Sequence, residues 1–198
     1  MQKTTQLLLC LFLIVSCQPK QQQKVEKKPD PEIMEQEVPD LLGYIKSNNI
    51  ASTALQIRID KSDKTLAVIH KEKVLKTYPV ALGSSKLDDK LQEGDNLTPE
   101  GIFYIQSKYP HKKWQYFMWL NYPTAASWKK HNQAKKEGKI GKNASIGGEV
   151  GIHGVVKGRD FLVSTGIPWT KGCISLKNKD LEIIYQIIGK KTPIYIQK

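Results

Sequence analysis

The sequence predicts a mainly β protein with a few helices, in the α+β class. Residues 55–60 alternate apolar and polar side chains, which is the two-residue period of a half-buried strand. Residues 65–70 and 74–82 follow as further β-rich runs, and Lys, Asp and Glu turns separate them. Only two stretches, 124–137 and 179–188, carry the signals that begin and end a helix. Strands therefore outnumber helices.

The strands are expected in a simple order. The first three form an antiparallel meander, and the polar segment 83–100 forms a loop, because it is rich in turn residues such as Gly94 and Asp95. Further strands are expected at 102–105, at 114–120 and at 192–197, where β-branched and aromatic residues recur. Strands thus run through most of the chain from residue 55 onward.

The two helices have recognisable ends. Thr124 is expected to cap the first helix, because its hydroxyl can accept a hydrogen bond from the first turn, and Gly138 ends that helix. Asn178 is expected to cap the second helix, and Gly189 follows it as a stop signal.

The first 17 residues resemble a bacterial lipoprotein signal. Lys3 is followed by an apolar run at 7–15, which is too short to cross a bilayer. The ending Ile14-Val15-Ser16-Cys17 resembles a lipobox, so residues 1–16 are expected to be removed and Cys17 to carry acyl chains that anchor the protein in a membrane. Plain cleavage near Ser16 is the alternative.

This signal predicts export. Gln18 stands where a retained inner-membrane lipoprotein often has Asp, which favours the periplasmic face of the outer membrane, and another cell-envelope membrane stays open. Residues 17–40 are expected to be the lipidated cysteine and a flexible tether, because Gln, Lys, Glu and Pro cannot bury enough apolar surface to fold. Residues 41–198 form the expected folded domain.

The positive charge belongs to that domain. The 198 residues carry a formal net charge of +12, and residues 41–198 alone hold 26 basic and 13 acidic side chains. Only Arg58 and Arg159 are arginines, the side chain best suited to reading bases and phosphates. An exported protein also meets no genome, so no nucleic-acid partner is expected. A wall polymer rich in carboxylates fits the charge better.

Cysteine usage points to chemistry. After loss of Cys10 with the signal and acylation of Cys17, Cys173 is the one remaining cysteine. A lone thiol is a liability in an oxidising compartment, which indicates a reactive role, although a buried inert cysteine stays open. A thiol nucleophile needs a base, and His153 lies between two glycines where a strand is expected to enter a loop. Gly172 permits a tight turn that can expose the sulfur and aim backbone N–H groups at an oxyanion.

These residues resemble the L,D-transpeptidase catalytic domain family. Ile152-His153-Gly154 and, further on, Thr170-Lys171-Gly172-Cys173-Ile174 match the family's His and Ser/Thr-x-Gly-Cys pattern. The resemblance spans about 55–198. Four other stretches agree with the family in the same order: 55–70, 76–80, 98–103 and 192–196. It implies a β-sandwich or barrel-like catalytic domain.

The resemblance implies acyl transfer on peptidoglycan tetrapeptide stems in cell-wall crosslinking or remodelling. Cys173 is the implied nucleophile and His153 the implied proton acceptor and donor, with no cofactor. Gly172, Gly154, Lys171, Ser175, Arg159 and Tyr122 are the expected substrate-binding or oxyanion residues. Many members have another residue at the positions of Lys171 and Ser175, which opens the question of stem recognition.

Other functions stay open. Segment 107–150 resembles a subgroup that includes an amidase, so hydrolysis of the same bond or of a lipoprotein–peptidoglycan link is an alternative. A non-catalytic wall-binding lipoprotein is another. The aromatic residues Trp114, Trp119, Tyr122 and Trp128 are expected in the core rather than in a sugar-stacking platform, with a wall of a substrate groove as the alternative. No metal site is expected, because no metal-ligand spacing occurs, and the oligomeric state is unknown.

Overall fold

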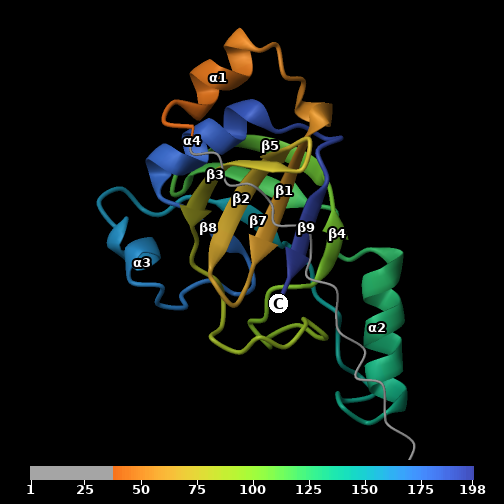
Figure 1. Cartoon of the computed structure of the whole chain (residues 1–198). Helices are drawn as coiled ribbons and strands as arrows, with labels where there is room; N and C mark the ends of the chain where they lie inside the picture. Colours follow the sequence, from red (N-terminus) through yellow and green to blue (C-terminus); the bar gives the residue numbers. More distant parts are fainter. Residues whose placement is uncertain (1–37) are drawn as a thin grey trace, which may run out of the picture. The chain divides into compact units, whose positions relative to one another are not determined.

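The computed structural model describes residues 38–198, so the predicted signal peptide, Cys17 and nearly all of the tether lie outside the described residues. The first sheet has the strand order β3-β2-β1-β9-β4 (Figure 1). Its strands are β1 (Leu55–Asp60), β2 (Thr65–His70), β3 (Lys73–Pro79), β4 (Gly101–Phe103) and β9 (Ile194–Gln197). The predicted antiparallel meander forms β1 to β3, and the C-terminal strand β9 joins it parallel to β1.

The second sheet has the order β5-β6-β7-β8. It consists of β5 (Ile105–His111), β6 (Gln115–Leu120), β7 (Gly151–His153) and the two-residue β8 (Ile174–Ser175). Strands β5, β6 and β7 are antiparallel, whereas β7 and β8 are parallel neighbours. The short strand β7 therefore ends at His153, and the short strand β8 begins directly after Cys173.

The largest apolar cluster of the described residues lies between the two sheets. Ile57 and Ile59 of the first sheet and Met118, Leu120 and Ile152 of the second are fully buried in one cluster. Alternation along each strand places these side chains on the inner faces. The predicted α+β fold with a β-sandwich is confirmed.

Four α-helices complete the described part of the chain (Figure 1). They are α1 (Leu41–Ser47), α2 (Ala125–Lys136), α3 (Phe161–Ser164) and α4 (Asn178–Ile187), with a short 3-10 turn at Ser52–Ala54. Thr124 caps α2 as predicted, by accepting a hydrogen bond from the Ser127 amide. Sequence patterns gave no signal for α1 or α3.

Two predicted boundaries are wrong. Lys177, not Asn178, is the residue before α4, because the Asn178 side chain instead accepts a hydrogen bond from the Val155 amide at 3.1 Å. The strand expected at 102–105 is two strands, because the chain leaves the first sheet after Phe103 and enters the second at Ile105.

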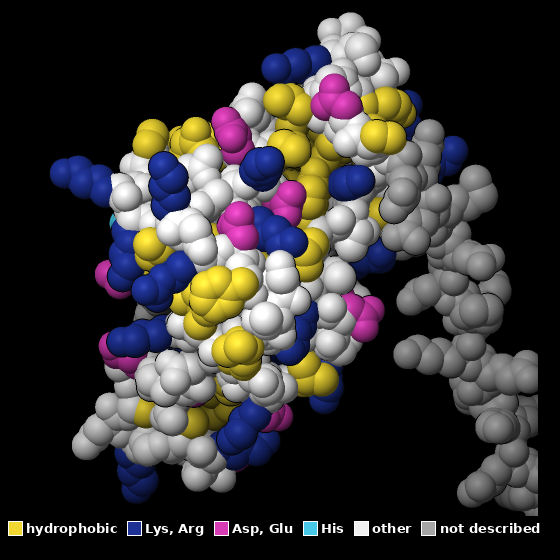
Figure 2. Space-filling model, turned by 90° about the vertical axis from the view of Figure 1, so that its left-hand side faces the viewer, with side chains coloured by type: hydrophobic (Ala, Val, Ile, Leu, Met, Phe, Trp, Pro, Cys, Tyr) yellow, Lys and Arg dark blue, Asp and Glu magenta, His cyan; other side chains and the backbone are white. Residues whose placement is uncertain are grey.

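Folded structure also begins earlier than residue 41. Val38 is 6% exposed and its amide donates to Leu75 O, and Asp40 caps α1. Within residues 38–198 no helix has the length and apolarity to cross a bilayer. Lys and Arg side chains are spread over the face shown in Figure 2, with fewer acidic ones between them.

Candidate active site

The outer face of the second sheet carries the chemically reactive side chains. Met118 and Ile152 point into the core, so their neighbours Phe117 and His153 point to the opposite face. Loops cover this face and leave a cavity of about 1040 Å³, which both His153 and Cys173 line.

Sheet register brings the two motifs together. His153 is the last residue of β7, and Cys173 lies directly before β8, where Ile152 pairs with Ile174 and His153 pairs with Ser175. Cys173 is two residues from Ser175, so its side chain lies on the same face as His153, diagonally across one strand spacing.

The turn before Cys173 requires glycine and is held by threonine. Gly172 has φ +117, and a Cβ there would lie 2.7 Å from Leu97 O. Thr170 Oγ1 donates to Cys173 O at 2.7 Å and accepts from the Gly172 amide at 3.3 Å. The backbone that carries the sulfur is therefore fixed from both sides.

The tautomer of His153 is set by a backbone carbonyl. His153 Nδ1 lies 2.7 Å from Gly154 O, which can only accept, so Nδ1 carries the proton. Ser175 Oγ donates to the same oxygen at 3.3 Å. In the neutral imidazole, Nε2 is then left as an acceptor that can take a proton.

Aromatic rings enclose the imidazole. Trp114 stacks on His153 with centroids 4.5 Å apart, Phe117 stacks at 5.6 Å, and Trp169 meets it edge-on at 5.4 Å. His153 is only 2% exposed. Burial, and to a smaller extent the nearby His111, lowers the pKa of His153 to about 4, against the opposing effect of the bond to the Gly154 carbonyl. At neutral pH His153 is uncharged.

The sulfur is also uncharged at rest. Burial, and to a smaller extent Glu149, raises the pKa of the Cys173 thiol to about 11, against the opposing effects of the Gly151 amide and Lys90. Cys173 Sγ donates to Glu149 O at 3.4 Å. No hydrogen bond joins Cys173 to His153 among residues 38–198, so the resting site is a neutral thiol beside a neutral base.

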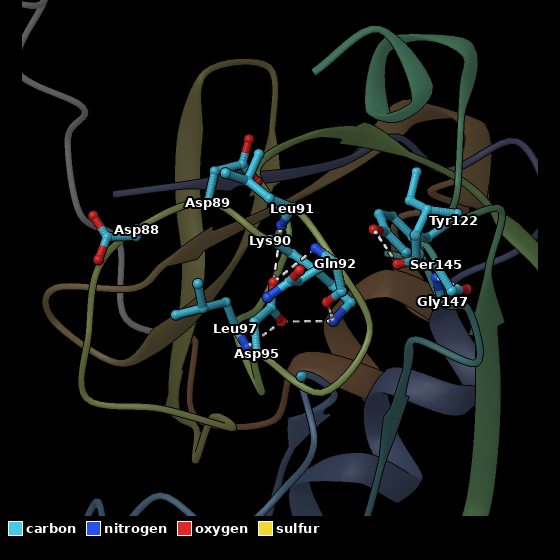
Figure 3. Close-up of polar contacts among 12 residues, drawn as sticks. Asp88, Asp89, Lys90, Leu91, Gln92, Asp95, Leu97, Tyr122, Ser145 and Gly147 are labelled. Carbon is cyan, nitrogen blue, oxygen red and sulfur yellow. Dashed lines mark hydrogen bonds and ion pairs between the residues drawn. The ribbon is translucent and has the colours of Figure 1, made fainter. Parts of the chain in front are cut away.

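The loop 84–100 forms one rim of the cavity, which it lines with Lys90, Glu93, Gly94 and Asn96. Figure 3 shows the polar contacts within this loop. The Asp95 carboxylate organises it by accepting from Lys90 Nζ at 2.7 Å and from three backbone amides, those of Leu91, Gln92 and Leu97. These hydrogen bonds lower the pKa of Asp95 although burial opposes them. The predicted loop is thus irregular in backbone but specifically folded.

Lysines tie this loop to the rest of the domain. Lys61 is 1% exposed and donates to Leu87 O, Asp88 O and Glu100 Oε1 at 3.1, 2.7 and 2.7 Å. From α2, Lys130 pairs with Asp89, and His131 Nδ1 donates to Leu91 O at 2.6 Å. Helix α2, expected to be a solvated face, therefore also supports the cavity rim.

The expected binding residues divide into two groups. Lys171 borders the cavity, and Gly172 shapes the turn beside it. The Gly154 amide donates to Trp114 O at 3.1 Å, so it is already used, and the Gly154 carbonyl orients His153. Ser175, paired with His153 on the neighbouring strand, is fully buried and does not line the cavity.

Arg159 and Tyr122 lie away from the cavity. Arg159 is exposed in the connection between β7 and α3 and is not among the residues that line it. Tyr122 is buried, and its hydroxyl donates to Ile146 O at 3.3 Å (Figure 3). This bond supports the segment 146–149, whose residues 147–149 form a second rim of the cavity. Burial raises the pKa of Tyr122.

Sequence reasoning missed several contributors. Trp169 and Glu149 flank the dyad, and Tyr109 extends the cavity floor. The position of Trp169 directly before the Thr170 motif could have indicated its role. Glu149 acts through its backbone carbonyl, so its side-chain type gave no indication. Of the tryptophans considered for a groove wall, Trp114 and Trp119 line the cavity, whereas Trp128 is exposed on α2.

No cluster of three or more His, Cys, Asp or Glu side chains suited to hold a metal occurs in the described part of the chain. The family model of the L,D-transpeptidase catalytic domain (YkuD) matches residues 55–196. The chain belongs to this family.

The chain is also similar to solved structures. The helical cell shape determining protein Pgp2 from Campylobacter jejuni is 18% identical, with a TM-score of 0.50 over 79% of this chain and 54% of that chain. An L,D-transpeptidase from Mycobacterium smegmatis is 16% identical, with a TM-score of 0.48 over 73% and 59% of the two chains. At these identities the likeness concerns the fold alone, and this chain spans less than two thirds of either structure. The comparison with curated proteins gave no match.

Proposed function

We propose that this L,D-transpeptidase-family protein is a cysteine acyl transferase acting on peptidoglycan tetrapeptide stems. One observation carries the proposal: His153 ends β7, Cys173 directly precedes the neighbouring parallel strand β8, both line one cavity, and His153 keeps Nε2 free as a base. A nucleophile and an oriented base beside a substrate-sized cavity are the parts that acyl transfer needs.

In the proposed reaction, Cys173 Sγ attacks the carbonyl carbon between the third and fourth stem residues. His153 Nε2 takes the thiol proton and delivers it to the amine of the departing D-alanine as the C–N bond breaks. This leaves a thioester on Cys173. An acceptor amine then attacks the thioester, gives a proton through His153 to the leaving sulfur, and forms the new amide.

The neutral resting dyad fits this sequence. A thiol with a pKa near 11 is not ionised in advance, so the proton moves to His153 only as the carbonyl is attacked. The enclosing rings of Trp114 and Trp169 keep water from His153. A protected imidazole favours an amine acceptor over water, which supports transfer above hydrolysis.

Hydrolysis is the second candidate function, as an L,D-carboxypeptidase or an amidase. The observation that favours it is the open charged side of the cavity, where Glu93, Glu149 and Lys171 are exposed to solvent. Water can enter there once the thioester has formed.

Product analysis separates these functions. The purified full chain is incubated with disaccharide-tetrapeptide. A dimer linked between third residues supports transfer, and a disaccharide-tripeptide alone supports hydrolysis. Cys173→Ala and His153→Ala should abolish both products; full activity of either variant rejects the mechanism. A wall-binding protein without activity would bind sacculi and form no covalent adduct at Cys173 with a carbapenem, as read from the intact mass.

We also propose that the protein acts as an exported lipoprotein at the periplasmic face of the outer membrane, through acylation of Cys17. The excess of basic over acidic residues in 41–198 suits weak retention near a carboxylate-rich wall. A Cys17→Ser variant should leave the membrane fraction, and membrane retention of that variant would reject the anchor.

A further inference from the structure

The cavity floor continues past the dyad as a strip of aromatic rings that the proposed chemistry does not use. Register pairs Tyr109 with Phe117 and Phe117 with His153, so all three point to the cavity side of the sheet. Trp119, two residues after Phe117, points the same way. Tyr109, Phe117 and Trp119 all border the cavity, and we call them the aromatic platform.

The platform is packed and its polar atoms are satisfied. Phe117 lies 6.1 Å from Tyr109 in a stacked arrangement and 5.6 Å from Trp119 edge-on. Trp119 Nε1 donates to the Tyr109 hydroxyl at 3.1 Å. Tyr109 is 39% exposed and Trp119 is half-buried. The exposed surface of the platform therefore belongs to Tyr109 and Trp119, because Phe117 is only 4% exposed, and none of the three side chains carries a charge.

The distance from the platform to the nucleophile follows from the register. Trp119 pairs with Gly151 on β7, and the Gly151 amide is directed at Cys173. Trp119 and Cys173 are therefore two strand spacings apart, about 9–10 Å. A Cβ on Gly151 would lie 2.5 Å from the Phe117 ring, so this ring covers Gly151 and makes the floor continuous from Cys173 to Trp119.

We propose that the aromatic platform is a subsite for an N-acetylhexosamine ring of the glycan that carries the donor stem. This inference rests on the proposed function. Three stem residues and the lactyl ether link separate the attacked carbonyl from the sugar ring, and the peptide part alone spans about 10–11 Å when extended. With that carbonyl at Cys173, the sugar lies over Trp119 and Tyr109.

The chemistry of the ligand fits the platform better than a stem residue does. The C–H face of a pyranose ring is weakly positive and packs against the negative face of an aromatic ring. An N-acetylhexosamine is neutral, as the platform is, whereas the acidic stem residues would find their partners at the charged rim, where Lys171 and Lys113 border the cavity.

Binding to the full-length Cys173→Ala variant tests the subsite without turnover. Calorimetric titrations compare disaccharide-tetrapeptide with the free tetrapeptide. We expect the disaccharide to tighten binding about tenfold, the size of one good aromatic stack. Adding Trp119→Ala should remove this advantage, and Trp119→Phe should keep much of it. Tyr109→Ala, at a more exposed position, provides a second variant with the same expected loss.

Trp128→Ala is the matched control, because Trp128 is 46% exposed on α2 and does not line the cavity; the tenfold advantage should remain. Equal binding of both ligands to Cys173→Ala, or an advantage that survives Trp119→Ala and Tyr109→Ala, overturns the subsite. An equal gain from free disaccharide added to free tetrapeptide overturns its assignment to the donor glycan. If the wild type forms neither product while the binding advantage persists, only the proposed function fails.

Discussion

The indole of Trp114 stacks on the imidazole of His153, with ring centroids 4.5 Å apart and an angle of 25° between the planes. Trp114 lies just before β6, and its carbonyl accepts the Gly154 amide at 3.1 Å. His111 also stacks on Trp114, with ring centroids 4.6 Å apart. The tryptophan therefore fixes the plane of the base and removes water from it.

Replacement of Trp114 by alanine should raise the pKa of His153. Loss of the ring admits water, which stabilises the imidazolium that burial now disfavours. A base must be neutral to act, so the acid limb of the rate profile should move from near pH 4 toward pH 6.5. Activity would then fall more at pH 5 than at pH 8. Carbapenem acylation rates between pH 4 and 8 measure this, with Trp114→Phe as the variant that keeps a ring. An unchanged acid limb in Trp114→Ala contradicts the role.

Alkylation of Cys173 should be slow at neutral pH. Its pKa of about 11 against the ordinary 9.0 gives a thiolate fraction about a hundredfold below that of a free thiol. The rate with iodoacetamide should rise steadily from pH 7 to 10 without levelling, since the thiol stays protonated in this range. Free cysteine in the same buffers is the reference. A plateau below pH 8 would show a thiolate already formed at rest.

Gly172→Ala should destabilise the domain. With φ at +117 and Leu97 O only 2.7 Å from the added Cβ, we expect a loss of about 2 kcal/mol or more in the free energy of unfolding. Urea denaturation measures it. Gly141→Ala, where a Cβ meets nothing within 4 Å, is the control and should unfold at the wild-type urea concentration. Equal midpoints for both variants would mean that the turn tolerates a side chain.

Lys61→Met should weaken the rim loop. The change removes three hydrogen bonds to loop 84–100 and leaves the Glu100 carboxylate without its partner at 2.7 Å. We expect the free energy of unfolding to fall by about 2 kcal/mol, and not by more, because Glu100 is partly exposed and water can solvate it. Acylation of Cys173 should slow as the rim loosens. Lys139→Met removes an exposed ion pair with Glu137 and should change neither quantity measurably. Hydrogen exchange of residues 84–100 reports the loop directly, and unchanged exchange in Lys61→Met would reject this account.

Local patterns predicted much of the sandwich. The alternation of 55–60 and the turns after it predicted the meander of the first sheet, because burial on one face imposes a two-residue period. The strand expected at 102–105 failed where the chain changes sheets at Tyr104, since both strands there have β character and no turn residue marks the change. Asn178 failed as a cap because a tertiary partner, the Val155 amide, takes its side chain.

The sequence by itself determined the residue types of the site. A lone cysteine after a glycine and a histidine between glycines predicted Cys173 and His153 as a dyad, and the matching of the family motif made that assignment specific. Tertiary structure decided what surrounds them. The parallel pairing of β7 with β8 puts both side chains on one face, and Trp114, which is 39 positions before His153 in the chain, packs on the imidazole.

Tertiary structure also decided which expected binding residues reach the cavity. Lys171 borders it. Ser175 is buried beside His153 on the neighbouring strand, and Tyr122 supports the rim segment at Ile146. Nothing in the local sequence distinguishes these positions, because exposure depends on which distant segments cover a strand end. The physical reason is general: spacing along a strand fixes the face to which a side chain points, but only packing of the whole chain fixes what lies over that face.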